Sequence, residues 1–227
     1  MKALRRAAVL LACLALAVAL IAAMLQLPPA AIDLPGMVEA QRSASGVEHP
    51  VTAVLLNFRG YDTLLEVAVL LLALFGVLAG TRVERRRRAR GFHPGVPLLK
   101  TFVRLLAPMM LLVAGYLLWA GAHQPGGAFQ AAAVLGGAAV LLHLARIMPA
   151  WVAPNRWRRG ALVAGLLLFL LAAAVPPMLG NGTLLQYPPA LAGAMILVIE
   201  SALTASLGLL LAGLFLCLSD DGVEFHP

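Results

Sequence analysis

The sequence predicts an all-α polytopic membrane protein with six transmembrane helices, both termini in the cytoplasm and no soluble domain. The chain of 227 residues is 62% hydrophobic and only 12% charged, about half the charged share of a typical soluble domain. Its apolar residues gather in long runs, and its Lys and Arg residues cluster beside them. This composition excludes an ordinary cytosolic enzyme, a disordered chain and a nucleic-acid-binding domain.

Six apolar segments are long enough, or nearly so, to cross the hydrocarbon of a bilayer, which takes about 20 residues. The first exceeds the apolar region of a cleaved signal peptide, so it is interpreted as a retained signal anchor. The third reaches full length when it begins near Phe102. The fifth holds Pro176 and Pro177, where a kink or a frayed end is expected. The segments are 7–27, 63–80, 105–120, 129–148, 161–179 and 189–218.

The basic residues predict the orientation of these segments. With the N-terminus inside, 15 Lys and Arg residues flank the inner ends and two, Arg42 and Arg59, lie outside. Positive residues favour the cytoplasmic side of a membrane, so both termini are predicted to be cytoplasmic. The arginine run 85–88 is interpreted as a topology anchor against anionic lipid. The outer loop 28–62 is expected to contain a short interfacial helix over 51–61.

Glu200 is the deepest ionisable residue, and such residues are costly in hydrocarbon. It lies 11 residues after Pro189, about 16 Å along a helix, which predicts a position near the middle of a bilayer about 30 Å thick. Thr204 is one turn further and shares its face. Two interpretations stay open: a carboxyl that loads a proton or binds Na+, or a protonated carboxyl that hydrogen-bonds a neighbouring helix.

Four further side chains are candidates for an ion path. Glu66 lies four residues after Asp62 on one helical face; it is either an interfacial acid that reaches water or part of a path with Asp62 at its outer end. Arg59, three residues before Asp62, is placed to pair with it. His123, in the loop 121–129, can titrate near neutral pH, and His143 is a second relay candidate; a structural role is the alternative for both histidines.

The loop 121–129 contains Pro125, Gly126 and Gly127, which break a helix and free backbone groups. Irregular backbone at membrane depth survives when it is buried in protein or lines a cavity. The loop is therefore expected to be either an outer turn or a re-entrant break. The segment that follows it is rich in Ala and Gly, which predicts close helix packing within the chain or against partners.

Motifs for cofactor chemistry are missing from the sequence. It has no Walker sequence, no dinucleotide fingerprint, no histidine pair suited to haem and no cysteine cluster. No cofactor and no metal site are predicted, and we expect a transporter subunit rather than an enzyme.

Two stretches resemble a known family. The residues 51–66, VTAVLLNFRGYDTLLE, resemble the end of the large subunit of Mrp-type (multiple resistance and pH) cation/proton antiporters, and the matching small subunit of membrane-bound hydrogenases. The residues 98–129, from LLKTFVRLLAP to GAHQPGGAF, are similar to the B-type component of these antiporters. The resemblance implies a two-helix unit at residues 1–90 fused to a four-helix B-type unit at residues 91–227.

The loop departs from the family signature Gly-His-Asn-x-Pro-Gly-Gly-Gly-Phe at three positions. Ala122 stands in place of the His, His123 in place of the Asn, and Ala128 in place of a Gly. The role of the family's His therefore does not transfer to this chain. The acid after Asp-Thr-Leu is retained as Glu66, whereas Glu200 rests on the depth argument alone.

The resemblance implies a function within a complex related to the membrane arm of respiratory complex I. The leading hypothesis is a multi-pass subunit of a multi-subunit Na+/H+ antiporter in the bacterial inner membrane, with other subunits and membrane lipid as partners and H+ and Na+, or another monovalent cation, as transported ions. The alternatives are a membrane-arm subunit of a membrane-bound hydrogenase or related redox-driven pump, and a scaffold without ion contact.

Overall fold

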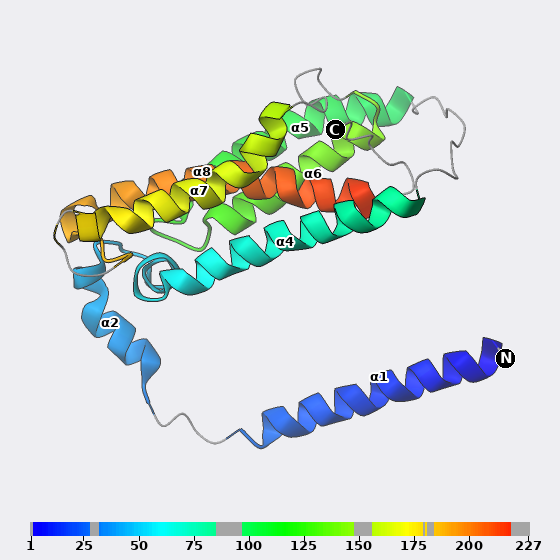
Figure 1. Cartoon of the computed structure of the whole chain (residues 1–227), viewed down its shortest axis with the longest axis horizontal. Coiled ribbons are helices and arrows are strands. Elements are labelled where there is room, and N and C mark those ends of the chain that lie inside the picture. The colour runs from blue at the N-terminus through cyan, green and yellow to red at the C-terminus, as the bar shows by residue number, and fades with distance from the viewer. Residues whose placement is uncertain are drawn as a thin grey trace. The chain divides into compact units, whose positions relative to one another are not determined.

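The computed structural model describes residues 2–27, 32–84, 97–147, 156–178, 180 and 184–218. Over these residues it contains helices and no strand (Figure 1). Five of the described helices are long and apolar enough to cross a membrane, whereas α6 (Ala128–Leu144) is apolar but has 17 residues. The all-helical, multi-span architecture is therefore confirmed. The five long helices are α1 (Lys2–Leu25), α4 (Gly60–Glu84), α5 (Pro97–Ala120), α7 (Arg156–Met178) and α8 (Pro189–Leu218).

The observed bounds follow the predicted segments closely. The helix α8 begins and ends where the sixth segment was predicted. The helix α7 continues through Pro176 and Pro177 and ends one residue later, at the predicted position of a frayed end. The helix α6 ends at Leu144; the predicted end of that segment at residue 148 lies outside the described residues, as do the arginine run 85–88 and the tail after residue 218.

The loop between α1 and α4 contains a helix that was not predicted, α2 (Leu34–Ser45). Its boundaries have ordinary local causes. The Asp33 Oδ1 atom accepts a hydrogen bond of 3.0 Å from the Gly36 N–H, as an N-cap residue does. Pro35 lies in the first turn, and Gly46, just after the last residue, has a φ of 70°, which favours glycine at a helix end.

The predicted interfacial helix over 51–61 is divided in the structure. It consists of a short helix, α3 (Pro50–Ala53), and a π-helical turn, η1 (Val54–Phe58). The long helix α4 then begins at Gly60, inside the range 51–61 that was predicted for the interfacial helix. The Thr63 Oγ1 atom donates to the Leu55 carbonyl at 2.6 Å, so the start of α4 is tied to the turn that precedes it.

By its internal contacts the chain divides into two units, Met1–Met37 and Val38–Pro227, and the division falls within α2. The first unit contains α1, whose apolar side chains are exposed on all sides, including Leu10, Leu14 and Met24. The Cys13 thiol is also exposed. A helix that is apolar all round belongs in a membrane or a protein core.

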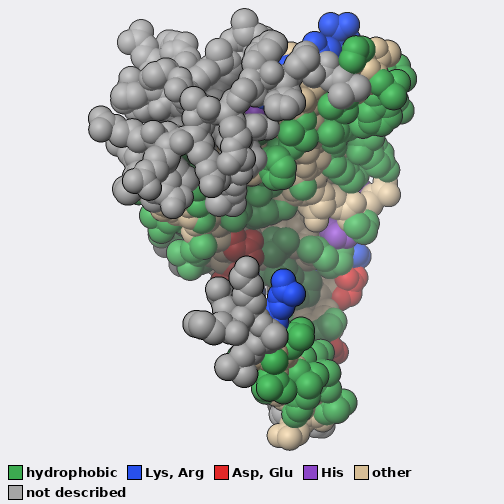
Figure 2. Space-filling model, turned by 90° about the vertical axis from the view of Figure 1, so that its right-hand side faces the viewer, with side chains coloured by type: hydrophobic (Ala, Val, Ile, Leu, Met, Phe, Trp, Pro, Cys, Tyr) green, Lys and Arg blue, Asp and Glu red, His purple; other side chains and the backbone are tan. Residues whose placement is uncertain are grey.

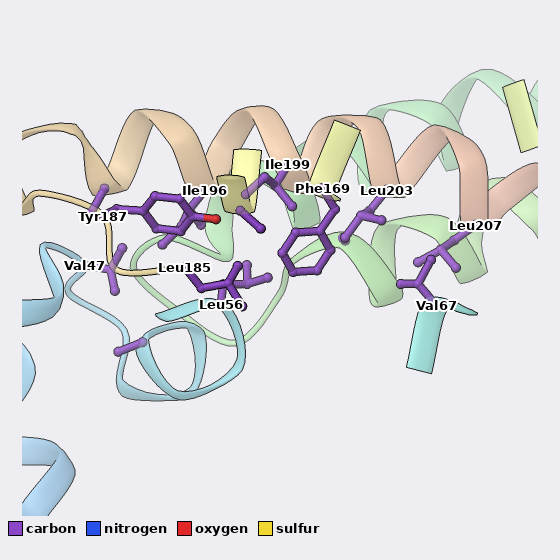
Figure 3. Packing of buried hydrophobic residues seen from close by; sticks show 14 of the residues in the cluster. Val47, Leu56, Val67, Phe169, Leu185, Tyr187, Ile196, Ile199, Leu203 and Leu207 are labelled. Carbon is purple, nitrogen blue, oxygen red and sulfur yellow. The ribbon is translucent and has the colours of Figure 1, made fainter. Parts of the chain in front are cut away.

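In the second unit α8 packs against α4, α6 and α7, and α5 packs against α6 (Figure 1). The main core lies along α8 and also includes the segment that joins α7 to α8 (Figure 3). Its large members come from five parts of the chain: Leu56, Val67, Phe169, Leu185, Tyr187, Ile196, Ile199, Leu203 and Leu207.

Two glycines let α6 and α8 approach closely. A Cβ on Gly136 would lie 3.3 Å from the Gly208 carbonyl oxygen, and a Cβ on Gly208 would lie 3.1 Å from the Leu135 Cβ. Both distances are tight, so larger side chains would push the helices apart. The prediction of close packing for the small-residue segment is confirmed.

Hydrophobic side chains cover much of the surface of the described residues in the view of Figure 2. On α5 alone Phe102, Leu112 and Trp119 are more than half exposed. Soluble monomers rarely expose such patches, whereas lipid or partner helices cover them in a bilayer. The exposed apolar surface and the long helices together indicate a multi-pass membrane protein.

Candidate functional site

The turn between α5 and α6 is closed by two backbone N–H groups that donate to one carbonyl oxygen. The Leu117 carbonyl accepts hydrogen bonds from the Gly121 N–H at 3.2 Å and from the Gly127 N–H at 2.8 Å, which folds the turn back on the end of α5. A Cβ on Gly126 would lie 2.5 Å from the same carbonyl oxygen, so this position requires glycine. The predicted break at Pro125–Gly127 is thus a tight turn, and α6 begins directly after it.

The Glu200 side chain lies at the first residue of α6. Its carboxyl accepts a hydrogen bond from the Ala128 backbone N–H, and a Cβ on Gly127 would lie 2.7 Å from its Oε1 atom. Gly127, the N-cap residue, has a φ of 108° and offers no side-chain cap. Since the first N–H groups of a helix lack partners within it and carry partial positive charge, the Glu200 carboxyl caps α6 from a neighbouring helix.

The surroundings of this carboxyl are apolar and closed. Glu200 is 5% exposed, and Ile196, Ile199 and Leu203, its neighbours on α8, are buried. Thr204 is also buried, but its hydroxyl donates to the Glu200 backbone carbonyl at 2.7 Å. Thr204 therefore shares the predicted face without hydrogen-bonding the carboxyl. A buried carboxyl beside one amide donor can accept and release a proton while its anion is stabilised by the start of α6.

His123 interacts with the loop that precedes α3. Its Nδ1 atom lies 2.9 Å from the Glu48 Oε2 atom, and its ring lies edge-on to Trp119 with centroids 5.9 Å apart. Both members of the His123–Glu48 pair are exposed. Beside them, the Thr52 hydroxyl donates to the Gly121 carbonyl. These contacts join the loop before α4 to the α5–α6 turn, and they give His123 a structural partner.

The two acids at the start of α4, Asp62 and Glu66, differ in their partners. Arg59 and Asp62 form the ion pair that their spacing predicts, with Nη2 and Oδ2 2.5 Å apart. Glu66, one turn further, is exposed, and within the described part of the chain its side chain has no hydrogen bond or ion pair. His143 lies half-buried in the last turn of α6, at the other end of that helix from Glu200.

Of the predicted candidates, Glu200, Thr204 and Gly127 lie in one cluster. Asp62 and Glu66 share the start of α4, while His123 lies in the α5–α6 turn and His143 at the far end of α6. Among the described residues no group of three His, Cys, Asp or Glu is placed to hold a metal ion. The Ala128 N–H and Glu48 were not predicted as partners. Gly127 was the available signal for the first, because a glycine N-cap leaves the following N–H groups without a side-chain acceptor.

Comparison with known proteins gives one family and two similar structures. A family model described as a domain related to the MnhB subunit of Na+/H+ antiporter matches residues 98–218. A chain of the membrane-bound sulfane sulfur reductase, an archaeal respiratory membrane complex, superposes with a TM-score of 0.71 at 24% identity, over 93% of this chain and 97% of that chain.

A chain of the Mrp complex from Dietzia sp. DQ12-45-1b superposes with a TM-score of 0.68 at 21% identity. The match covers 92% of this chain and 26% of that chain, which is therefore much the longer of the two. Among curated proteins, none matches. At these identities the two structural matches show a shared fold, and the fold extends over nearly the whole chain.

Proposed function

This chain belongs to the family of domains related to the MnhB subunit of Na+/H+ antiporters and is a membrane subunit of an Mrp-type cation/proton antiporter-like complex; we propose that it contributes directly to the ion path of that complex and also to its assembly. In this proposal, external protons enter down the proton-motive force and drive export of Na+ or another monovalent cation. The complex resides in the bacterial inner membrane.

The proposed topology has six spans with both termini in the cytoplasm. The helix α6 is the shortest of the six, and its 17 residues extend about 25 Å at about 1.5 Å per residue. That length approaches the hydrocarbon thickness of about 30 Å, and the preceding turn, which has its own hydrogen bonds, supplies the rest. In the proposed division into residues 1–90 and 91–227, the two parts meet where α4 packs against α7 and α8 and where the loop before α4 reaches the α5–α6 turn.

The observation that supports an ion-path role best is the Glu200 carboxyl at the start of α6. A carboxyl buried in a membrane helix is costly unless it serves transport or structure. In the anionic state it caps α6; when it takes up a proton, the Ala128 N–H loses its charged acceptor and the α5–α6 turn is held less firmly. We therefore assign Glu200 as a group that exchanges a proton during turnover, with Thr204 fixing the local backbone of α8.

The remaining candidates have secondary roles in the proposal. Asp62 and Glu66 form the outer part of the path, His123 stabilises the α5–α6 turn through Glu48, and His143 is a relay group at the inner end of α6. Each role predicts a different result on substitution, because only groups that exchange protons should change transport when assembly is unaffected.

The test uses the whole complex in everted membrane vesicles. Na+-dependent dequenching of a pH dye reports antiport, and blue-native gels report the amount of assembled complex. We expect Glu200→Gln to abolish dequenching while the assembled amount stays at the wild-type level, with the exposed Ser201→Ala on the same helix as the control. Equal dequenching per assembled complex in Glu200→Gln and wild type would remove this residue from the ion path. Loss of assembly in both Glu200→Gln and Glu66→Gln would instead indicate a scaffold.

A redox-driven complex is the second candidate, and one observation favours it. The structural match to a chain of the membrane-bound sulfane sulfur reductase covers 97% of that chain, so the same fold occurs as a complete subunit of a respiratory complex. Copurification of the tagged protein separates the two candidates. Partners with iron–sulfur or nickel-ligand cysteines would indicate the redox complex, and antiporter subunits without them the antiporter.

A further inference from the structure

One face of α4 points away from the rest of the second unit. Its residues are spaced at helical intervals, opposite to the buried Val67, Leu71 and Leu74. Val69 on this face is 62% exposed, and a Cβ on Gly76 would have no atom within 4 Å. We refer to this surface as the Glu66 face; it consists of Asp62, Glu66, Val69, Ala73 and Gly76.

Glu66 makes this face unsuitable for lipid. It is the seventh residue of α4, which begins at Gly60, where the candidate span also begins. At about 1.5 Å per residue it lies about 9 Å below that end, beyond the reach of the short Glu side chain. Ionisable groups at such depth face a protein interior or a water-filled cavity rather than lipid. The Arg59 guanidinium already pairs with Asp62, so it does not supply the charge that Glu66 lacks.

The lower part of the same face is shaped for a second helix. Ala73 and Gly76 are three residues apart and share one side of α4, and Ala73 lies between Gly76 and Glu66 along the helix. Small residues on one face let a second membrane helix approach closely. An acid without a partner among the described residues and a small-residue surface for a close helix therefore lie on one face.

The helix α1 does not have the chemistry to complete this face. Between residues 7 and 27 it has no Lys, Arg or His. It offers no positive charge to a carboxylate on a membrane helix. Within the described part of the chain no residue supplies the opposite charge to Glu66, and the proposed multi-subunit complex has membrane helices for that role.

We propose that the Glu66 face is the docking surface for a membrane-spanning helix of another subunit, which presents a Lys or Arg side chain to Glu66 and small residues to Ala73 and Gly76. The proposal rests on the proposed function in requiring a multi-subunit complex, but it does not require that Glu66 carry an ion. It assigns α4 to an interface with a neighbouring subunit and gives that neighbour a defined chemistry.

The first test compares two matched glycines in the complete complex. Gly76→Leu fills the Glu66 face, and Gly115→Leu makes the same change on α5, where a Cβ would also have no atom within 4 Å. We expect Gly76→Leu to lower the ratio of assembled complex to free chain by about tenfold, the effect of one good interhelical contact, and Gly115→Leu to leave it unchanged. Wild-type assembly in Gly76→Leu, or an equal fall in both variants, would overturn the proposal.

The second test identifies the neighbour of α4 directly and does not depend on a change in the amount of assembled complex. In a chain with Cys13→Ala and Cys217→Ala, Gly76→Cys is labelled with a benzophenone maleimide, which couples to the new thiol and, on irradiation in native membranes, inserts into a C–H bond of the neighbouring helix. The proposal predicts an adduct that contains a second subunit and a Lys or Arg in its helix at the level of Glu66. An adduct within the chain, to α1, or no adduct in intact complex would contradict it.

The charge is tested with Glu66→Lys and Glu66→Gln. Repulsion predicts that Glu66→Lys assembles less than Glu66→Gln, and that a Lys or Arg→Glu change in the crosslinked partner restores assembly of Glu66→Lys. Equal assembly of the two variants would overturn the assigned charge pair. Antiport is measured in parallel. An adduct without antiport would refute the proposed function but not the proposed interface. Antiport without an adduct would refute the proposed interface but not the proposed function.

Discussion

Glu200 and Glu66 are both acids in long apolar helices, and their surroundings differ completely. Glu200 is buried against the start of α6 and accepts the Ala128 N–H. Glu66 is exposed on α4 and has no bonding partner within the described part of the chain. The comparison shows that this chain satisfies one of these acids internally, whereas the other has no partner among the described residues. Substitution of Glu200 should therefore affect the stability of this chain, and substitution of Glu66 should affect the assembly of the complex.

The largest effect is expected on removal of the internal acceptor. Glu200→Leu leaves the Ala128 N–H buried without a partner, which costs about 1–3 kcal/mol, and it also removes the proposed proton-exchanging group. Denaturant titration of the purified full chain in detergent should show the lost stability. Glu200→Gln, which keeps a side-chain carbonyl as acceptor, should retain most of it. A stable Glu200→Leu chain would mean that the carboxyl does not cap α6.

The next effect concerns the glycine beneath the carboxyl. Gly127→Ala places a Cβ 2.7 Å from the Glu200 Oε1 atom at a φ of 108°, so the turn or the carboxyl must move, at a cost of about 1–3 kcal/mol. Gly115→Ala is the matched control and should stabilise its helix by up to about 1 kcal/mol. Equal unfolding free energies for Gly127→Ala and wild type would show that the turn adjusts without cost.

A smaller effect of opposite sign is expected at Tyr187, in the segment that leads into α8. Its hydroxyl is buried without a hydrogen-bond partner among the described residues, and burial raises the pKa of this phenol to about 12. Because the folded state holds the proton more tightly than the unfolded state, the chain should lose stability as the pH rises above 10 towards 12. Tyr187→Phe should remove that loss and add up to about 1 kcal/mol below pH 10.

Thermal unfolding on both sides of pH 10 checks this, with wild type as the reference. An unchanged pH slope in Tyr187→Phe would assign the slope to another group. A clear loss of stability below pH 10 would show that the hydroxyl has a partner.

The smallest effect is predicted for Glu66→Gln in the isolated full chain. The side chain is exposed there and has no partner within the described residues, so the free energy of unfolding should change by no more than about 0.5 kcal/mol. The same substitution should matter in the complex, where a partner helix covers the face. A large loss in the isolated chain would mean that part of this same chain already pairs with Glu66, and the comparison with Glu200 would fail.

The sequence predicted features that depend on local pattern. Hydrophobic length predicted both ends of α8, and the spacing of Arg59 and Asp62 predicted their ion pair. Asp33 and Gly46 are ordinary start and stop signals for α2. The helix was missed because the residues between these two signals form no long apolar run. These cases depend on residues within a few positions of one another.

The features that escaped prediction depend on tertiary contact. Depth along α8 identified Glu200, and composition identified the break at Gly127, but no periodicity relates two positions 73 residues apart. The pairing of His123 with Glu48 is similar, since the loop before α3 reaches the α5–α6 turn through the packing of the second unit. Sequence located the costly groups, and packing decided which of them found partners.

The most direct test of the central claim, that the Glu200 carboxyl exchanges a proton at the start of α6, is infrared difference spectroscopy of the assembled complex during Na+-driven turnover. A protonated-carboxyl band should appear or disappear with turnover in wild type and be absent from Glu200→Gln. Identical difference spectra for the two complexes would contradict it.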